Sequence, residues 1–202
     1  MMKKLHRLNA MVLGVFLTLH LVNHLMFVIG PSTHLAMMEN LRVVYRQQLV
    51  EILIIGLFAA QIILGLVLVW SRGRPTGRWA WAQAISGLYL AFFLLQHVGA
   101  TLAARGMYAG FDTNTWFALG VVSRAPFLFY FAPYYFLAIV AIFVHVAAAL
   151  RFRKWQQPAT GFQKTLPVIG IVFGAIVVGA MIGHAADGVP QTYQDYLNSF
   201  GL

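Results

Sequence analysis

The sequence contains no cysteine and few charged residues. Without cysteine the chain cannot form disulfides, thiolate zinc sites, cysteine-ligated iron–sulfur clusters or covalent c-type haem attachments. Any metal chemistry must therefore use histidine, carboxylate or methionine side chains. Charged residues make up 9% of the chain and hydrophobic residues 60%, whereas soluble domains carry about 25% charged residues. A chain of this composition cannot cover a globule with polar surface, so it belongs in a lipid bilayer.

Acidic residues are scarcer than basic ones. Five Asp and Glu stand against 14 Lys and Arg, which gives a net charge of +9. A basic balance can indicate nucleic-acid binding, but here no basic cluster lies on an independent soluble domain. We therefore expect no nucleic-acid partner, and we expect the basic residues to orient the chain in membrane lipid.

Five apolar stretches are long enough to cross the hydrocarbon core of a membrane, which takes roughly 20 helical residues. They cover approximately 8–30, 48–70, 80–104, 126–150 and 166–186. The first stretch is too long for the apolar region of a signal peptide, and no small-x-small cleavage site follows it, so we expect it to remain as a span. The predicted fold class is all-α: one membrane domain over residues 1–202, with five transmembrane helices in a bundle.

The basic residues divide unequally between the two sets of helix ends. Ten lie at the N-terminus and after the second and fourth spans: Lys3, Lys4, Arg7, Arg72, Arg74, Arg78, Arg151, Arg153, Lys154 and Lys164. The opposite ends carry Arg42, Arg46, Arg105 and Arg124. The positive-inside rule then predicts a cytoplasmic N-terminus and a C-terminus outside. The outer loop from about 105 to 125 is expected to lie at the membrane interface because of its aromatic residues: Tyr108, Phe111 and Trp116.

The last apolar stretch carries four glycines in two small-xxx-small pairs: Gly170, Gly174, Gly179 and Gly183. This spacing lets a neighbouring helix approach closely, because it removes side chains from one face of the helix. We therefore expect the glycines to serve helix packing rather than ligand binding.

Histidines inside the spans are the strongest functional signal in the chain. A titratable side chain in hydrocarbon is rare and costs free energy, so by default it marks a functional site. Counting along each helix at about 1.5 Å per residue places His20, His24 and His97 in the outer half of the membrane and His145 alone in the inner half. The remaining histidines lie near helix ends, where an interfacial position would explain them: His6, His34 and His184.

Two histidines at one depth on different helices can be the two axial ligands of a haem b. The neutral imidazole nitrogen binds iron, and an apolar bundle holds the macrocycle. A bis-histidine iron has no open position, so it would transfer electrons rather than bind oxygen. His20 and His97 form such a pair, and His24 lies one turn further along the same face, as a reserve ligand or a contact to the haem edge. The alternative is that these histidines hydrogen-bond across helices or to backbone carbonyls without any haem.

Four segments together resemble a known family. The segment "LHRLNAMVLGVFLTLHLVNH" resembles helix one of the five-helix cytochrome b membrane anchor of succinate:quinone and quinol:fumarate oxidoreductases, in its single-chain, dihaem form. The likeness continues in "VEILIIGLFAAQIILG", "AISGLYLAFFLLQHVGATLAARG" and "YYFLAIVAIFVHVAAALRF" and covers essentially the whole chain. The resemblance implies that His20 and His97 hold an outer haem b. It also implies that His145 is the helix-four ligand of an inner haem.

The second span departs from the family pattern. Gln61 stands where the family has the helix-two histidine, and its depth fits that of His145. A glutamine oxygen is a poor ligand for haem iron compared with imidazole. The inner haem is therefore expected to be absent, five-coordinate or unusually ligated.

The resemblance also implies a place in a respiratory complex of the bacterial cytoplasmic (inner) membrane. Succinate dehydrogenase or fumarate reductase chemistry would occur on a separate cytoplasmic flavoprotein subunit. An iron–sulfur subunit would then connect it to this chain, which exchanges electrons with a membrane quinone, menaquinone or ubiquinone. The chain has no dinucleotide-binding fingerprint and no cysteine for clusters, so it cannot perform the first steps alone.

Glu51, near the outer end of the second span, matches a family carboxylate associated with the outer quinone site. It would accept or release the proton that accompanies quinone redox chemistry. Arg42 and Gln48 lie near it in sequence and could help bind a quinone carbonyl. The alternative for Glu51 is an interfacial glutamate that pairs loosely with Arg46.

Two other functions stay open at the level of sequence. Another b-type cytochrome, such as a hydrogenase membrane subunit or a stand-alone quinol-oxidising cytochrome, would also use intramembrane histidine pairs. A haem-free membrane anchor or transport protein would use its histidines as interhelical hydrogen-bond partners or proton relays. Many transporters have broken helices at matching places in two halves, whereas here only Pro133 interrupts a span.

Overall fold

The computed structural model describes residues 1–107, 111–153 and 158–201, so Tyr108 and Lys154 lie outside the described residues. The described residues form helices and no β-strand. Five helices are long and apolar enough to cross a membrane: α1 (Met2–Leu25, continued by the 3-10 turn η1, Met26–Val28), α3 (Gln48–Arg72), α4 (Arg78–Met107), α6 (Phe127–Arg153) and α7 (Gly161–Ala186). The predicted all-α fold with five membrane-spanning helices is therefore confirmed.

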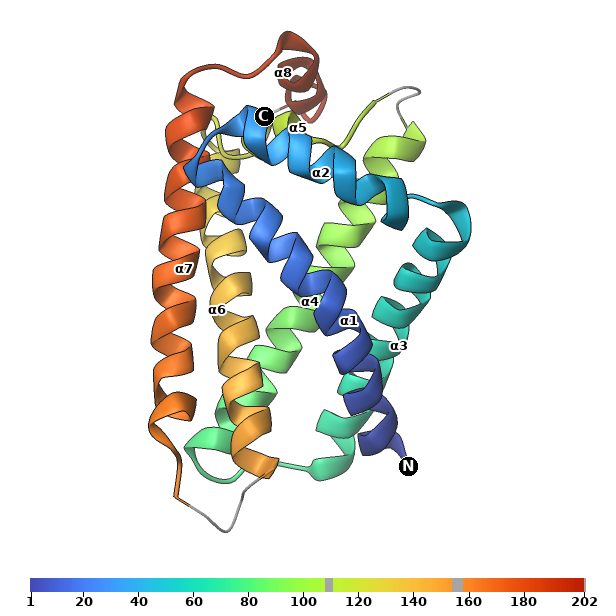
Figure 1. The fold of residues 1–202 in the computed structure, drawn as a ribbon, viewed down its shortest axis with the longest axis vertical. Helices are drawn as coiled ribbons and strands as arrows, with labels where there is room; N and C mark the ends of the chain where they lie inside the picture. Colours follow the sequence, from blue (N-terminus) through green and yellow to red (C-terminus); the bar gives the residue numbers. More distant parts are fainter. Residues whose placement is uncertain (108–110, 154–157, 202) are drawn as a thin grey trace.

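The five long helices run between two ends of the molecule, and α1 crosses diagonally in front of α4 (Figure 1). The closest packing joins α6 to α7 and to α4, while α1 packs mainly on α3. The N-terminus lies at one end together with the α3–α4 connection, the end of α6 and the start of α7, and the C-terminus lies at the other (Figure 1). The basic segments that predict the cytoplasmic side thus share one end, and the orientation itself stays a prediction.

The helix starts differ from the predicted spans where local hydrogen bonding extends a helix. The last span begins at Gly161 rather than near 166, because Thr160 and Gln163 form a capping box. The Thr160 hydroxyl oxygen accepts from the Gln163 backbone N–H at 3.3 Å, and Oε1 of Gln163 accepts from the Thr160 N–H at 3.1 Å. This reciprocal pair satisfies two otherwise unpaired groups of the first turn.

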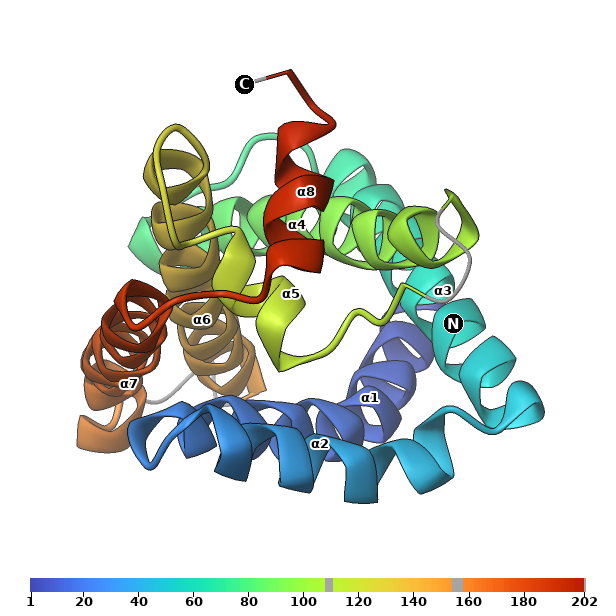
Figure 2. The ribbon, with the colours of Figure 1, turned by 90° about the horizontal axis from the view of Figure 1, so that it is seen from above.

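Three shorter helices lie across the outer end of the bundle: α2 (Pro31–Tyr45), α5 (Thr115–Gly120) and α8 (Gln191–Asn198) (Figure 2). The apolar pattern of the sequence predicts no helix in these segments. The loop predicted over about 105–125 includes α5, and Thr115 and Leu119 at its centre are fully buried in the protein; its position at the membrane interface stays a prediction. Leu119 belongs to an apolar core with Phe27 of η1, Met181 of α7 and Leu197 of α8. The outer end is therefore a packed cap over the spans.

The glycines of α7 divide into two groups. A Cβ added at Gly170 would lie 2.7 Å from Cβ of Phe143, and one at Gly174 would lie 3.1 Å from the ring of Phe136, both on α6. A Cβ at Gly179 or Gly183 would meet nothing within 4 Å. The predicted close approach of a neighbouring helix holds for the first pair, while the second pair faces open space in this chain.

Replacing Gly170 with alanine should lower the free energy of unfolding in detergent micelles by about 1–3 kcal/mol, because the added methyl overpacks the α6–α7 contact. Gly179→Ala is the matched control, and it should be neutral or slightly stabilising since alanine favours a helix over glycine by about 1 kcal/mol. Equal effects of the two substitutions would contradict the packing described.

Candidate functional site

The three outer-half histidines meet inside the bundle. The ring centres of His20 on α1 and His97 on α4 are 6.1 Å apart. The ring centres of His20 and His24 are 4.5 Å apart, and their Nε2 atoms are separated by 3.2 Å. His20 thus lies beside both of the other histidines that counting along the spans placed in the outer half.

The spacing of His20 and His97 suits a metal held between them. With metal–imidazole bonds of about 2.0 Å and a ring radius of about 1.1 Å, two axial imidazoles would have ring centres about 6 Å apart. Nδ1 of His24 is buried and has no hydrogen-bond partner among the described residues. A buried polar atom without a partner costs free energy, so its presence beside this pair is a second sign of a ligand site.

Aromatic rings hold the two imidazoles in place. The ring of Phe16 stacks on His20, with ring centres 5.6 Å apart and planes inclined by 15°. The ring of Phe93 stacks on His97 at 5.0 Å and 14°. Each ligand candidate therefore has a phenylalanine four residues earlier on its own helix, and the two rings are oriented in the same way.

The structure overturns the interfacial explanation of His34. This residue of α2 is 2% exposed and stacks on Phe27 at a ring-centre distance of 3.8 Å. Its Nδ1 lies 2.7 Å from the Thr115 hydroxyl, and the Asn23 amide donates to its Nε2 at 3.2 Å. Burial, followed by the charges of His20 and Arg42, lowers the pKa of His34 to about 3. The imidazole is thus neutral at physiological pH and joins α1, α2 and α5.

A helix signal that could have revealed His34 is present in the sequence. Proline is favoured in the first turn of a helix, and Pro31 occupies that position in α2. His34 and Met38 then lie four residues apart on one face, and both are buried.

The inner-half histidine, His145 on α6, hydrogen-bonds to a neighbouring helix. Its Nδ1 lies 3.2 Å from the hydroxyl of Ser86 on α4. Ser86 donates its own proton to the carbonyl of Ala82 at 2.6 Å, so it accepts the Nδ1–H of His145. In the neutral imidazole this leaves Nε2 unprotonated, which is the form that binds metals.

The Gln61 side chain hydrogen-bonds to two residues of α1. The Asn9 amide donates to the Gln61 Oε1 and to the Leu57 carbonyl, both at 2.8 Å. The Nε2 of Gln61 lies 3.3 Å from the Nε2 of His6. The interfacial explanation of His6 is therefore corrected, because its ring points into the bundle against α3.

Glu51 pairs with an arginine that is distant in sequence. Both terminal nitrogens of Arg105 on α4 donate to the Glu51 carboxylate, and the two side chains are 28% and 25% exposed. The predicted loose partner, Arg46, instead reaches Thr113. Arg42 forms an ion pair with Asp112 at 3.0 Å, so its guanidinium also has a partner within the protein.

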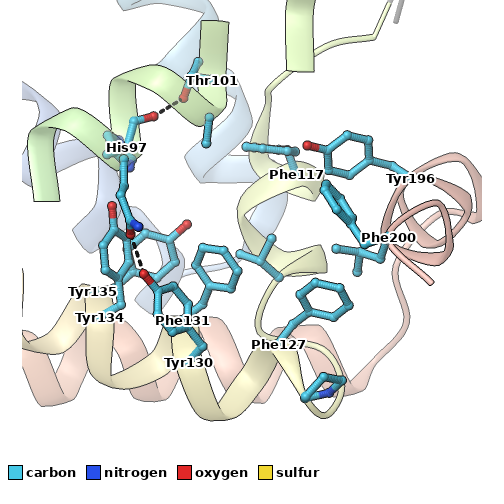
Figure 3. Close-up of a pocket in the computed structure, with 15 residues that line it drawn as sticks. His97, Thr101, Phe117, Phe127, Tyr130, Phe131, Tyr134, Tyr135, Tyr196 and Phe200 are labelled. Atoms are coloured by element: carbon cyan, nitrogen blue, oxygen red, sulfur yellow. Dashed lines mark hydrogen bonds between the residues drawn. The ribbon is translucent and has the colours of Figure 1, made fainter. Parts of the chain in front are cut away.

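A cavity of about 550 Å³ lies beside His97, between α4, α5, α6 and α8 (Figure 3). Its volume is in the range of small-molecule sites, about 300–1,000 Å³. Aromatic rings form most of its wall: Phe117, Phe127, Tyr130, Phe131, Tyr134, Tyr135, Tyr196 and Phe200. The hydroxyl of Tyr130 donates to Oε1 of Gln96, and both residues are exposed on the spans. The cavity thus has a polar group at a rim that faces lipid.

Fold and geometry together define a class, a five-span helical membrane protein with histidine side chains in both halves of its bundle. Comparisons with protein-family models, curated proteins and solved structures find no match. Within the described ranges no group of three or more His, Asp or Glu side chains is arranged to hold a bare metal ion.

Proposed function

We propose that this chain is a haem b-binding membrane anchor of a succinate dehydrogenase or fumarate reductase complex in the bacterial cytoplasmic membrane. It would pass electrons between a cytoplasmic iron–sulfur subunit, fed by a flavoprotein subunit, and membrane quinone. The observation that carries this proposal is the His20–His97 pair with its ring-centre distance of 6.1 Å. The resemblance of four spans to the cytochrome b anchors adds the partners and the dicarboxylate reaction.

The residues around the pair have separable roles in this proposal. His20 and His97 would hold the haem from α1 and α4, and the stacked Phe16 and Phe93 fix the planes of their imidazoles. When bound, haem supplies a one-electron carrier inside the apolar bundle. His24, whose Nε2 is 3.2 Å from that of His20, would then be released to contact the haem edge.

The cavity beside His97 is a better candidate for the quinone site than the surroundings of Glu51. A quinone is a flat, lipid-soluble ring, and this cavity has aromatic walls (Figure 3). Two of its lining residues, Gln96 and Tyr130, are exposed on the spans. The Gln96 amide and the Tyr130 hydroxyl at the rim can hydrogen-bond a quinone carbonyl. The quinone role that the resemblance gives to Glu51 requires its carboxylate to leave Arg105.

A haem-free membrane anchor or transport protein is the competing function. The observation that favours it is the contact of the His20 and His24 Nε2 atoms at 3.2 Å, which gives each of these two nitrogens a partner without a metal. The network of Asn23, His34 and Thr115 shows that a histidine at this depth can be held by hydrogen bonds alone.

A pyridine-haemochrome assay on the purified chain tests the proposal. Wild-type protein should contain haem b with a low-spin spectrum, and His20→Ala or His97→Ala should remove the outer haem almost completely, because each leaves iron with one axial ligand. His184→Ala is the matched control, since this histidine lies at the end of α7 beside Asp187, and it should retain full haem content. A colourless wild-type protein would contradict the proposal and support the haem-free function.

A further inference from the structure

The inner half of the bundle contains a second pair of histidines, His6 on α1 and His145 on α6. The ring of His6 lies beside Gly65 on α3 and that of His145 beside Gly87 on α4, and these two helices pack on each other. Because His6 contacts Gln61, its ring reaches the depth of that residue, 11 positions before the end of α3 (72 − 61) and so about 16 Å along the helix. His145 is 8 positions before the end of α6 (153 − 145), which corresponds to about 12 Å. His6, although near the start of α1, thus lies at a depth similar to that of His145.

The hydrogen bonds at Gln61 define the protonation state of His6. The Leu57 carbonyl can only accept, so the Asn9 amide nitrogen faces it and also donates to the Gln61 Oε1. The Gln61 amide nitrogen is therefore turned toward His6 and donates to its Nε2. The proton of His6 lies on Nδ1, which is buried and has no partner in the described part of the chain.

Both inner histidines thus have an unprotonated Nε2. For His145, the bond to Ser86 fixes this form, as an outer hydrogen bond does for metal-binding histidines in general. For His6, only a neutral amide occupies the lone pair, and iron can replace it without any change of protonation. A glycine also adjoins each ring: a Cβ at Gly87 would lie 3.0 Å from the Cε1 of His145, and one at Gly65 would lie 3.5 Å from the Cε1 of His6.

We propose that His6 and His145 are the axial ligands of an inner haem, and that Gln61 is a positioning residue for His6 rather than a ligand. The inference rests on the proposed cytochrome function and deepens it, because it supplies the ligand that the second span lacks. Helix α1 would then contribute one ligand to each haem, His6 to the inner and His20 to the outer. Coordination of His6 exchanges the Gln61 N–H for iron and involves no redox step.

Haem stoichiometry and spectra of single variants test this assignment. The wild-type chain should contain two haems per chain, with two low-spin signals in electron paramagnetic resonance. His6→Ala and His145→Ala should each retain one haem with the outer signal unchanged. His20→Ala should instead lose the outer signal. Added imidazole should restore the second low-spin signal in His6→Ala, which a merely structural role of His6 would not produce. Gln61→Ala should keep two haems but shift the inner signal, and His184→Ala should match wild type.

The outcomes separate this inference from the proposed function. Two haems in His6→Ala, with an unchanged inner signal, would overturn the assignment of His6. One haem in wild type, lost in His20→Ala but retained in His6→Ala, would overturn the inner site and leave the proposed function intact. A haem-free wild type would overturn both. The persisting outer signal reports that each inner variant is folded.

Discussion

Replacing His34 with alanine should lower the free energy of unfolding by about 3–5 kcal/mol, the largest stability loss expected of any single histidine outside the haem sites. The substitution removes a fully buried ring that stacks on Phe27. It also leaves the Asn23 amide and the Thr115 hydroxyl without their partner in an enclosed region. The loss therefore combines a cavity with two unsatisfied polar groups, and it should be measured as unfolding in detergent micelles.

Two variants control this result. His184→Ala changes the same residue type at a side chain that is 29% exposed and faces Asp187 at 3.6 Å, so its effect should stay within about 0.5 kcal/mol. His34→Gln keeps groups that can accept from Asn23 and donate to Thr115, so it should recover part of the loss. If His34→Ala were no more damaging than His184→Ala, the packing of α2 against α1 and α5 would be wrong.

The spans could be predicted from sequence because hydrocarbon imposes a length and a composition on any helix that crosses it. The three short helices at the outer end could not, because they have only 15, 6 and 8 residues and no apolar run that would identify them. In α2, for example, the buried His34 and Met38 precede Glu39 and Arg42, which form an ion pair at 3.0 Å. Tertiary contacts, rather than an apolar run, determine which side of this helix is covered.

Of the candidate site, only the depth of each residue in the membrane could be predicted from the sequence. Depth follows from counting residues along a span, and it brought His20 and His97 together correctly. The tilt and rotation of a helix do not follow from its sequence, and they decide which side chains meet across the bundle. For this reason the contact of His6 with Gln61 was missed. The aromatic cavity was also missed, because two of its walls are helices α5 and α8.

Neutralising either partner of the Glu51–Arg105 pair should destabilise the protein by about 2–4 kcal/mol. Removing one member of a buried pair costs about 3–5 kcal/mol. The loss expected here is smaller because the two side chains are 28% and 25% exposed. Glu51→Gln and Arg105→Gln should each show this loss in detergent unfolding. The double variant should lose less than the sum of the two, because neither charge is then left alone.

The same variants decide between a structural and a catalytic role of Glu51. If the carboxylate serves the α3–α4 contact, the rate of haem reduction by added quinol, per folded haem, should stay within about twofold of wild type in both single variants. If Glu51 instead transfers the proton of quinone chemistry, Glu51→Gln should slow the reaction at least tenfold while Arg105→Gln, which leaves the carboxylate in place, should not. The structure favours the first outcome, because both terminal nitrogens of Arg105 donate to this carboxylate. The quinone would then have to bind elsewhere, and the aromatic cavity beside His97 offers a site on the same side of the bundle as the outer histidine pair.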